Sequence, residues 1–407
     1  MNEKLLQTPE GVRDIYGDEM KKKQTITGKI HDVLSRFGYQ DIETPSFEFF
    51  DIFNMEIGSA PSNEMYKFFD RNNETLVLRP DITPSIARSV AKYYADEALP
   101  VRLSYEGKCF VNAHQHQGKL SEFTQIGGEM INDDSSASDA DSIACVINCL
   151  LAAGLHEFQI EIGDVSFFKG LIEEAGFGDA EEKRIRAYIS DKNFYGLSDY
   201  IEKLSIDDST KKVFSSLDRL FGNAEILEDA RSLVKNETSL EAIRRLTSVY
   251  AALSSYGLTE YVSFDLSMIS RFHYYTGIVF RGYTYGTGDA VVTGGRYNHL
   301  LTQFGKDAPA VGFAIYVDDL MNALSRNRIA IEISHTDALV VYDRSNQESA
   351  IKFAEKLRGD GESTMLVRKS DKHSIEEYKA YAGRMQFKKM ITFREDGDYE
   401  ISDICAC

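Results

Sequence analysis

The spacing of hydrophobic residues changes character three times along the chain. Residues 1–165 mix β-type alternation with amphipathic helical periods, and residues 166–260 are charged and almost purely helical in period. β-rich sequence returns in 261–328, and strands and helices alternate in 329–407. Apolar residues recurring every three or four positions predict helices, whereas strict alternation predicts half-buried strands. We therefore expect an α+β fold: an antiparallel-sheet core with helices, a helical insertion, and a small C-terminal α/β domain with a partly parallel sheet.

Within the first stretch, the pattern predicts two helices and a series of strands. An amphipathic helix is expected over 18–37, ended by Gly38, and a second over 81–97, with Asp81 as N-cap and Pro84 in its first turn. Strands are expected at 39–48, 74–79, 101–111, 121–131 and 156–164. The third and fourth of these flank a polar loop and predict a long hairpin.

Composition and charge exclude some classes of function. The chain has 407 residues, of which 43% are hydrophobic, so it is long enough for several folded domains. Its 46 Lys and Arg against 64 Asp and Glu give a net charge of −18, which argues against a large face for binding a polyanion. The section from His335 onward has 12 basic and 14 acidic residues, a net −2, and offers nucleic acid little long-range attraction.

The sequence indicates a reduced, soluble, cytoplasmic protein. The first twenty residues contain no apolar run that could act as a signal-peptide core, and no apolar stretch reaches the 18 residues of a membrane span. Of five cysteines, Cys145 and Cys149 lie one helical turn apart in an apolar run and are interpreted as buried thiols. Cys405 and Cys407 lack a second ligand pair for zinc.

Motifs for phosphate or metal binding are weak. The glycine-rich stretches 282–289 and 293–299 lack the ending of a P-loop and a strand–GxGxxG–helix context, so turns and close backbone packing are the favoured interpretation. His114 and His116 alternate in a polar loop, where two such side chains usually point apart. We therefore expect no metal and no cofactor.

A set of carboxyl, amide, hydroxyl and phenol groups is more informative. Asp81 and Thr83 lie at the start of the 81–97 helix, and Gln125 and Glu129 lie four residues apart on one face of a strand. Three tyrosines lie in later β segments. If the sheet brings them together, carboxylates and an amide would face a cationic amine, and phenols with a carboxylate would face a polar ring. The set comprises Asp81, Thr83, Gln125, Glu129, Tyr274, Tyr275 and Tyr297.

The order of these residues resembles the core of a class II aminoacyl-tRNA synthetase of the histidyl-tRNA synthetase type. The resemblance covers about residues 8–325 and, less specifically, the C-terminal domain, which would then be anticodon-binding-like. The opening segment, the dimer-forming motif 1 and three further segments occur in the family's order: TPEGVRDIYGDE, FGYQDIETPSFE, LRPDITPSIAR, YYTGIVF and GGRYNHLLTQFG.

The ATP-binding positions of that family are not preserved. Its motif 2 has arginines where this chain has Val111 and His114, and a glutamate where this chain has Ala113. A separate segment of the family, R-G-L-D-Y-Y, has a further catalytic arginine where this chain has Ser270, next to Arg271. In motif 3 a tyrosine stands at a glycine position, and Asp319 reverses the charge of the ATP-binding arginine. Loss of one preorganised donor costs about 3–4 kcal/mol of transition-state stabilisation, so we expect no adenylate formation and no catalytic residue.

The resemblance implies that the histidine side of the pocket survives. By position, Asp81, Thr83 and Gln125 correspond to residues that hold the α-amino group of histidine, although Asp81 is one methylene shorter than the family's glutamate. Glu129, Tyr275 and Tyr297 correspond to residues around the imidazole.

A synthetase-like body that keeps an amino-acid pocket and loses its ATP groups resembles the regulatory subunits of ATP phosphoribosyltransferase. That family implies a homodimer through the core, a short-form catalytic subunit as partner in a hetero-octamer of four and four chains, and histidine feedback at the first step of histidine biosynthesis. It implies neither tRNA nor membrane binding. Two alternatives remain open: an active histidyl-tRNA synthetase, or a free-standing histidine-binding protein. A short-form catalytic subunit in the same genome would discriminate between them.

Overall fold

The chain divides into two structural units, Met1–Ile331 and Glu332–Cys407. The structure is a computed structural model, and it describes residues 6–53, 61–112, 120–269, 274–394 and 398–404. Each unit has its own sheet and its own apolar core.

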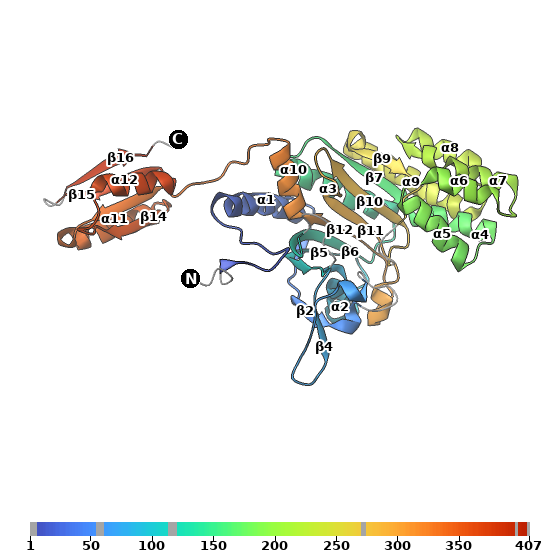
Figure 1. The fold of residues 1–407 in the computed structure, drawn as a ribbon, viewed down its shortest axis with the longest axis horizontal. Coiled ribbons are helices and arrows are strands. Elements are labelled where there is room, and N and C mark those ends of the chain that lie inside the picture. Colours follow the sequence, from blue (N-terminus) through green and yellow to red (C-terminus); the bar gives the residue numbers. More distant parts are fainter. Residues whose placement is uncertain (1–5, 54–60, 113–119, 270–273, 395–397, 405–407) are drawn as a thin grey trace. The chain divides into compact units, whose positions relative to one another are not determined.

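A nine-stranded mixed sheet forms the centre of the first unit (Figure 1), in the order β1-β5-β6-β12-β11-β10-β7-β9-β8. Most neighbours are antiparallel, including the hairpin of β5 and β6, which confirms the hairpin expected from the sequence. The pairs β1–β5 and β7–β9 are parallel. The strands are β1 (Gln40–Asp41), β5 (Val101–Phe110), β6 (Glu122–Ile131), β7 (Phe158–Asp164), β8 (Phe221–Gly222), β9 (Val262–Asp265), β10 (Ile278–Thr284), β11 (Val292–Arg296) and β12 (Ala310–Tyr316).

Helices α1 (Gly17–Arg36) and α3 (Ser136–Ala153) pack on one face of this sheet. The predicted N-terminal helix is confirmed as α1, and α3 packs between it and strands β11 and β12. Among the described residues, α3 is the one helix whose length and composition would suit a membrane span, yet most of it is buried in the fold, as a core helix is. Cys145 and Cys149 are buried free thiols on α3, as expected, whereas Cys405 and Cys407 lie outside the described residues.

The opposite face carries α2 (Thr83–Tyr93), beside a second, antiparallel sheet. Its strands are β2 (Phe47–Phe49), β4 (Thr75–Leu78) and β3 (Lys67–Phe69), in that order. The expected strand over 39–48 is split into β1 and β2, because a proline at position 45 has no N–H for a strand ladder. Helix α2 is shorter than the predicted 81–97, and Ile82 rather than Asp81 is its N-cap. Asp81 still accepts the backbone N–H of Ile82, at 2.7 Å.

Between β7 and β9 the chain forms a group of helices, drawn together in green and yellow in Figure 1. The longest, α9, packs against α3, α4 and β7, which joins the group to the central sheet. Asn236 caps its start by accepting the N–H of Ser239, and Gly257 ends it in the left-handed conformation that favours glycine. The helices are α4 (Val165–Ala175), α5 (Asp179–Ser190), α6 (Phe194–Glu202), α7 (Asp208–Ser216), α8 (Glu225–Leu233) and α9 (Glu237–Tyr256).

Helix α10 (Val317–Arg326) follows β12 and completes the first unit. The second unit has a four-stranded sheet in the order β14-β13-β15-β16, in which β13 pairs parallel with both neighbours. Its helices α11 and α12 contribute to separate apolar clusters. The parallel strand pairs and these two helices confirm the predicted small α/β unit with a partly parallel sheet. The elements are β13 (Ala338–Tyr342), α11 (Gln347–Gly359), β14 (Thr364–Arg368), α12 (Ile375–Arg384), β15 (Lys389–Phe393) and β16 (Tyr399–Asp403).

Candidate functional site

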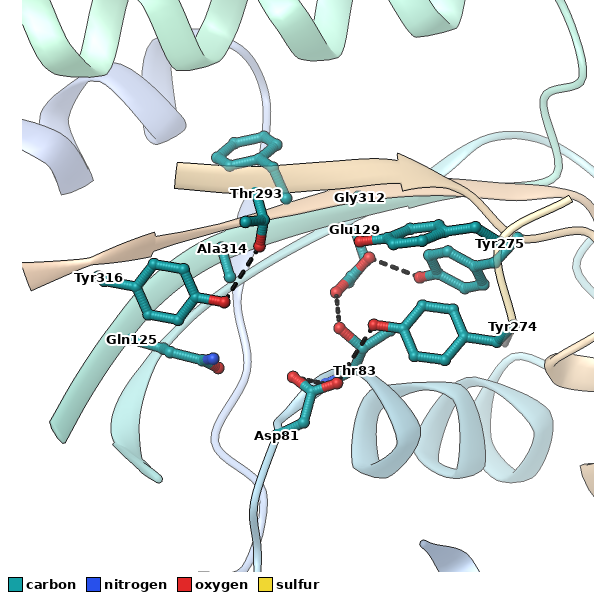
Figure 2. A pocket seen from close by; sticks show the side chains of 12 residues that line it. Asp81, Thr83, Gln125, Glu129, Tyr274, Tyr275, Thr293, Gly312, Ala314 and Tyr316 are labelled. Atoms are coloured by element: carbon teal, nitrogen blue, oxygen red, sulfur yellow. Dashed lines mark hydrogen bonds between the residues drawn. The ribbon is translucent and has the colours of Figure 1, made fainter. Parts of the chain in front are cut away.

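A polar pocket lies between the central sheet and the start of α2 (Figure 2). All seven residues singled out from the sequence line it, together with five that were not in that set. The seven are Asp81, Thr83, Gln125, Glu129, Tyr274, Tyr275 and Tyr297, and the additional five are Thr293, Gly312, Phe313, Ala314 and Tyr316. The enclosed space is about 10 Å³, close to what one water molecule needs, so a larger ligand requires the lining side chains to move apart.

Strand alternation positions the polar groups of the sheet. Gln125 and Glu129 lie four residues apart on β6 and therefore on the same face, as predicted. Their partners on β12 are Tyr316 and Gly312, respectively. A side chain at Gly312 would collide with the carboxylate of Glu129, so the glycine makes room for this group at its end of the pocket.

Glu129 is almost completely buried at the centre of a hydrogen-bond network. Its Oε1 accepts from Thr83 Oγ1 at 2.7 Å, and its Oε2 accepts from the Tyr297 hydroxyl at 2.5 Å. Burial raises the pKa of Glu129 from 4.5 to about 8, although both hydrogen bonds favour the charged form. The pocket therefore holds a carboxyl group that readily takes up or loses a proton near neutral pH.

Asp81 is the second buried carboxyl group of the pocket. Its Oδ1 accepts the backbone N–H of Ile82, and its Oδ2 accepts from the Tyr274 hydroxyl at 3.3 Å. Burial raises the pKa of Asp81, and the backbone hydrogen bonds at the start of α2 oppose this shift. A cationic ligand group placed here would restore the charged form.

Three tyrosine rings form the wall around Glu129. The rings of Tyr274 and Tyr275 lie 4.8 Å apart, and those of Tyr274 and Tyr297 pack edge to face at 5.7 Å. Such contacts hold aromatic side chains in defined orientations. Figure 2 shows two of these rings, Tyr274 and Tyr275, beside the Glu129 carboxyl group.

The other end of the pocket carries neutral polar groups. The hydroxyls of Thr293 and Tyr316 lie 3.1 Å apart, and the Gln125 amide oxygen accepts from Cys109 Sγ at 3.2 Å. Among the described residues that line the pocket, none has a positively charged side chain. The arrangement therefore suits a ligand with cationic or N–H-donating groups.

The structure describes two of the five positions at which the resemblance implies lost ATP-binding groups. Val111 follows β5, where its N–H donates to the Ser121 carbonyl, and Asp319 is exposed in the first turn of α10. A negative charge is favourable at a helix N-terminus and unfavourable for an approaching phosphate. The other three, Ala113, His114 and Ser270, lie outside the described residues, as does His116.

Of the five lining residues outside the set chosen by sequence, two carry hydroxyl groups, and each is absent from that set for a different reason. Tyr316 is a tyrosine at a glycine position of motif 3, which marks it only as a change in the former ATP site. Thr293 belongs to a glycine-rich stretch whose favoured interpretation is turns and close packing. Their shared pocket arises because β12 lies between β6 and β11 in the sheet.

Comparisons with known proteins agree with this architecture. A family profile described as histidyl-tRNA synthetase matches residues 11–320. An ATP phosphoribosyltransferase regulatory subunit of Ruminiclostridium cellulolyticum is 40% identical over 98% of this chain and 94% of its own length. Its counterpart from Acetivibrio thermocellus is 38% identical over 99% of this chain and 96% of its own length.

Solved structures show the same fold. A Bacillus halodurans protein described as an ATP phosphoribosyltransferase regulatory subunit/histidyl-tRNA synthetase superposes with a TM-score of 0.86 at 31% identity, over 95% of this chain and 98% of that one. A histidyl-tRNA synthetase from Nostoc has a TM-score of 0.79 at 18% identity, over 98% and 96% of the two chains, which shows the fold alone. With a histidyl-tRNA synthetase-like fold and this level of identity over nearly its full length, the chain belongs to the family of ATP phosphoribosyltransferase regulatory subunits.

Proposed function

We propose that the chain acts as the non-catalytic regulatory subunit of ATP phosphoribosyltransferase, is required for activity of a short-form catalytic subunit, and senses histidine through the pocket described above. The observation that carries the ligand assignment is the pair of buried carboxyl groups, Glu129 and Asp81, in a pocket whose described lining has no cation. Family membership supports the regulatory role.

The proposed ligand fits the chemistry of the two carboxyl groups. Asp81, Thr83 and Gln125 would hold the α-ammonium group, because a carbonyl oxygen such as that of Gln125 has a second lone pair beyond the one used by Cys109. Glu129, Tyr275 and Tyr297 would surround the imidazole. A ring with two nitrogens can exchange a proton with a carboxyl group whose pKa is about 8.

The proposal includes a homodimer formed through the core and a hetero-octamer with the catalytic subunit. Exposed aromatic side chains on β2 and β3 support an interface on the three-stranded sheet, since exposed apolar surface is typical of interaction sites. Phe47, Phe49 and Phe69 are 52%, 55% and 70% exposed.

The proposal also implies a cytoplasmic protein that neither binds tRNA nor forms an adenylate. Asp319 at the α10 N-terminus and Val111 after β5 supply no positive charge for a triphosphate. An ATP–pyrophosphate exchange assay with histidine should therefore give no signal. Clear exchange would favour the synthetase alternative.

Co-expression with a short-form catalytic subunit tests the regulatory role. We expect the two chains to purify together, phosphoribosyltransferase turnover to require this chain, and added histidine to reduce that turnover. A catalytic subunit that is equally active alone would contradict the proposal.

Calorimetry tests the ligand independently of the partner. The chain should bind L-histidine, and Glu129→Gln and Tyr275→Phe should each weaken binding. Glu157→Gln, which changes an exposed residue before β7, is the matched control. If histidine binds and the catalytic subunit does not, the chain is the free-standing histidine-binding alternative.

A further inference from the structure

We propose that Tyr316, with Thr293, forms the end of the pocket that holds the ligand's carboxylate and rejects ligands extended at that group. This inference rests on the proposed histidine site and assigns a selectivity-determining residue within it. Tyr316 would contact the ligand through its hydroxyl and limit the ligand's length through its ring.

The strand register places Tyr316 at the far end of the pocket from Glu129. Along β12, Gly312 pairs with Glu129, and Tyr316, four residues later, pairs with Gln125. Four residues of strand span about 13 Å of backbone, so these two pairs mark opposite ends of the pocket. Ala314, which has a small side chain, lies between them on β12 and also lines the pocket.

Figure 2 shows the same end-to-end arrangement of the side chains. Glu129 and Tyr275 lie at one end, while the Tyr316 ring lies at the other with its hydroxyl turned inward toward Thr293. A ligand whose imidazole reaches Glu129 would extend its other end toward the Tyr316 hydroxyl.

The hydroxyl pair can donate one hydrogen bond to a ligand. Tyr316 and Thr293 lie 3.1 Å apart, and one hydroxyl donates to the other. Two hydroxyls carry two hydrogens, so a second hydrogen remains for an acceptor inside the pocket. A carboxylate oxygen is the natural partner, because hydrogen bonds to charged acceptors are shorter and stronger than neutral ones.

The charge of the lining supports this role. Because none of the described lining residues is cationic, no arginine or lysine among them can pair with a carboxylate. Burial raises the pKa of Tyr316 to about 12, so the phenol keeps its proton at physiological pH. A neutral donor can hold a carboxylate near the carboxyl groups of Asp81 and Glu129 without adding repulsion.

The Tyr316 ring is also fixed well enough to act as a wall. It packs against Phe123 with ring centroids 6.0 Å apart, and its hydroxyl is held by Thr293. A free carboxylate ends at this wall, whereas an amide, ester or adenylate of the same amino acid would need the space that the ring occupies.

Calorimetry with three probes and three variants tests both parts of the proposal. The probes are L-histidine, histamine, which lacks the carboxylate, and L-histidine benzylamide, which is extended there. The variants are Tyr316→Phe, Tyr316→Ala and Thr293→Val, and Tyr285→Phe at an exposed turn is the control. Thermal melting of each variant checks that it is folded.

We expect Tyr316→Phe to weaken histidine binding about tenfold, as loss of a hydrogen bond to a charged group does, and to change histamine binding less than about twofold. Thr293→Val should shift the same histidine-to-histamine ratio in the same direction, which covers the case of an unfolded tyrosine variant. Wild type should reject the benzylamide, and Tyr316→Ala should bind it.

Equal losses for histidine and histamine, or no loss for either, would overturn the role of Tyr316 while leaving the histidine site intact. Tight binding of the benzylamide by wild type would overturn the role of the ring as a wall. If wild type binds none of the three probes, the histidine site itself is wrong and this inference falls with it.

Discussion

Arg296 and Asp139 form a salt bridge whose side chains are 1% and 0% exposed, with the Arg296 Nε donating to Asp139 Oδ1 at 2.8 Å. Arg245, from α9, donates to the other carboxylate oxygen at 2.7 Å. One buried carboxylate on α3 thus joins β11 to the helices between β7 and β9. Arg296 precedes Tyr297, so the network ends beside the pocket.

Asp139→Ala should therefore destabilise the protein strongly. It would remove the buried carboxylate shared by Arg296 and Arg245 and leave Arg296 with the largely exposed Asp134, at 3.2 Å. Loss of one partner of a buried ion pair costs about 3–5 kcal/mol. Glu228→Ala, which removes an exposed partner of Arg231, should change the free energy of unfolding by less than about 1 kcal/mol. Denaturant unfolding of both variants measures the difference, and equal midpoints would contradict a stabilising role for the Asp139 carboxylate.

Gly312→Ala should damage the pocket and the fold together. Its new methyl group would meet the Glu129 carboxylate and a carbonyl of β6, and overpacking of this kind costs about 1–3 kcal/mol. Gly28→Ala is the matched control, because nothing lies near a side chain at that helical position and alanine favours helix by up to about 1 kcal/mol. Thermal midpoints should move in opposite directions; a stabilised Gly312→Ala variant would be inconsistent with the close approach of Gly312 and Glu129.

The raised pKa of Glu129 predicts a pH dependence of stability. The carboxyl group releases its proton near pH 4.5 when the chain is unfolded and near pH 8 when it is folded. Between these values the unfolded state binds fewer protons, so the free energy of unfolding falls as the pH rises. The pKa values of Asp81 and Asp164 are also raised by burial, with the same sign.

Comparison of wild type with Glu129→Gln isolates the contribution of this group. Thermal midpoints at pH 5.5, 7 and 8.5 should fall more steeply for wild type than for the variant. Parallel curves would show that Glu129 keeps an ordinary pKa in the folded protein.

His31 should titrate above its ordinary value. Its pKa is raised mainly by the hydrogen bond to Glu106, at 3.1 Å, with a further contribution from Asp41. The stabilisation from protonated His31 is complete below pH 6.5 and is lost as the pH rises through the higher folded value. NMR titration should show this shift, and Glu106→Gln should reduce it whereas Glu157→Gln should not.

Local patterns predicted much of the architecture because they depend on near neighbours. Alternation identified β5, β6 and β7, and the four-residue spacing placed Gln125 and Glu129 on one face. The errors are also local. A proline divided one expected strand into β1 and β2, and α2 began two residues beyond the expected cap at Asp81.

The contacts of Tyr316 could not be predicted, because they depend on which strands pair with β12. Tyr316 meets Gln125 only because β12 pairs with β6, and it meets Thr293 only because β12 also pairs with β11. Neither pairing leaves a periodic signal in the sequence. The family resemblance pointed to residues that line one pocket. Tyr316 stands where the family has a glycine, so the family offers no side chain that would have indicated its position.

The position of the helices α4–α9 between β7 and β9 has a consequence for how the chain folds. Glu129 lies before these helices and Tyr274 after them, and the antiparallel pairing of Phe158 with Thr284 must close a loop of more than a hundred residues. Contacts this distant in sequence form slowly, because the entropy of loop closure is lost before they stabilise the chain. A nascent or partly folded chain would therefore lack the pocket. A ligand of this pocket would bind only chains in which the strands before and after the helices α4–α9 have already paired.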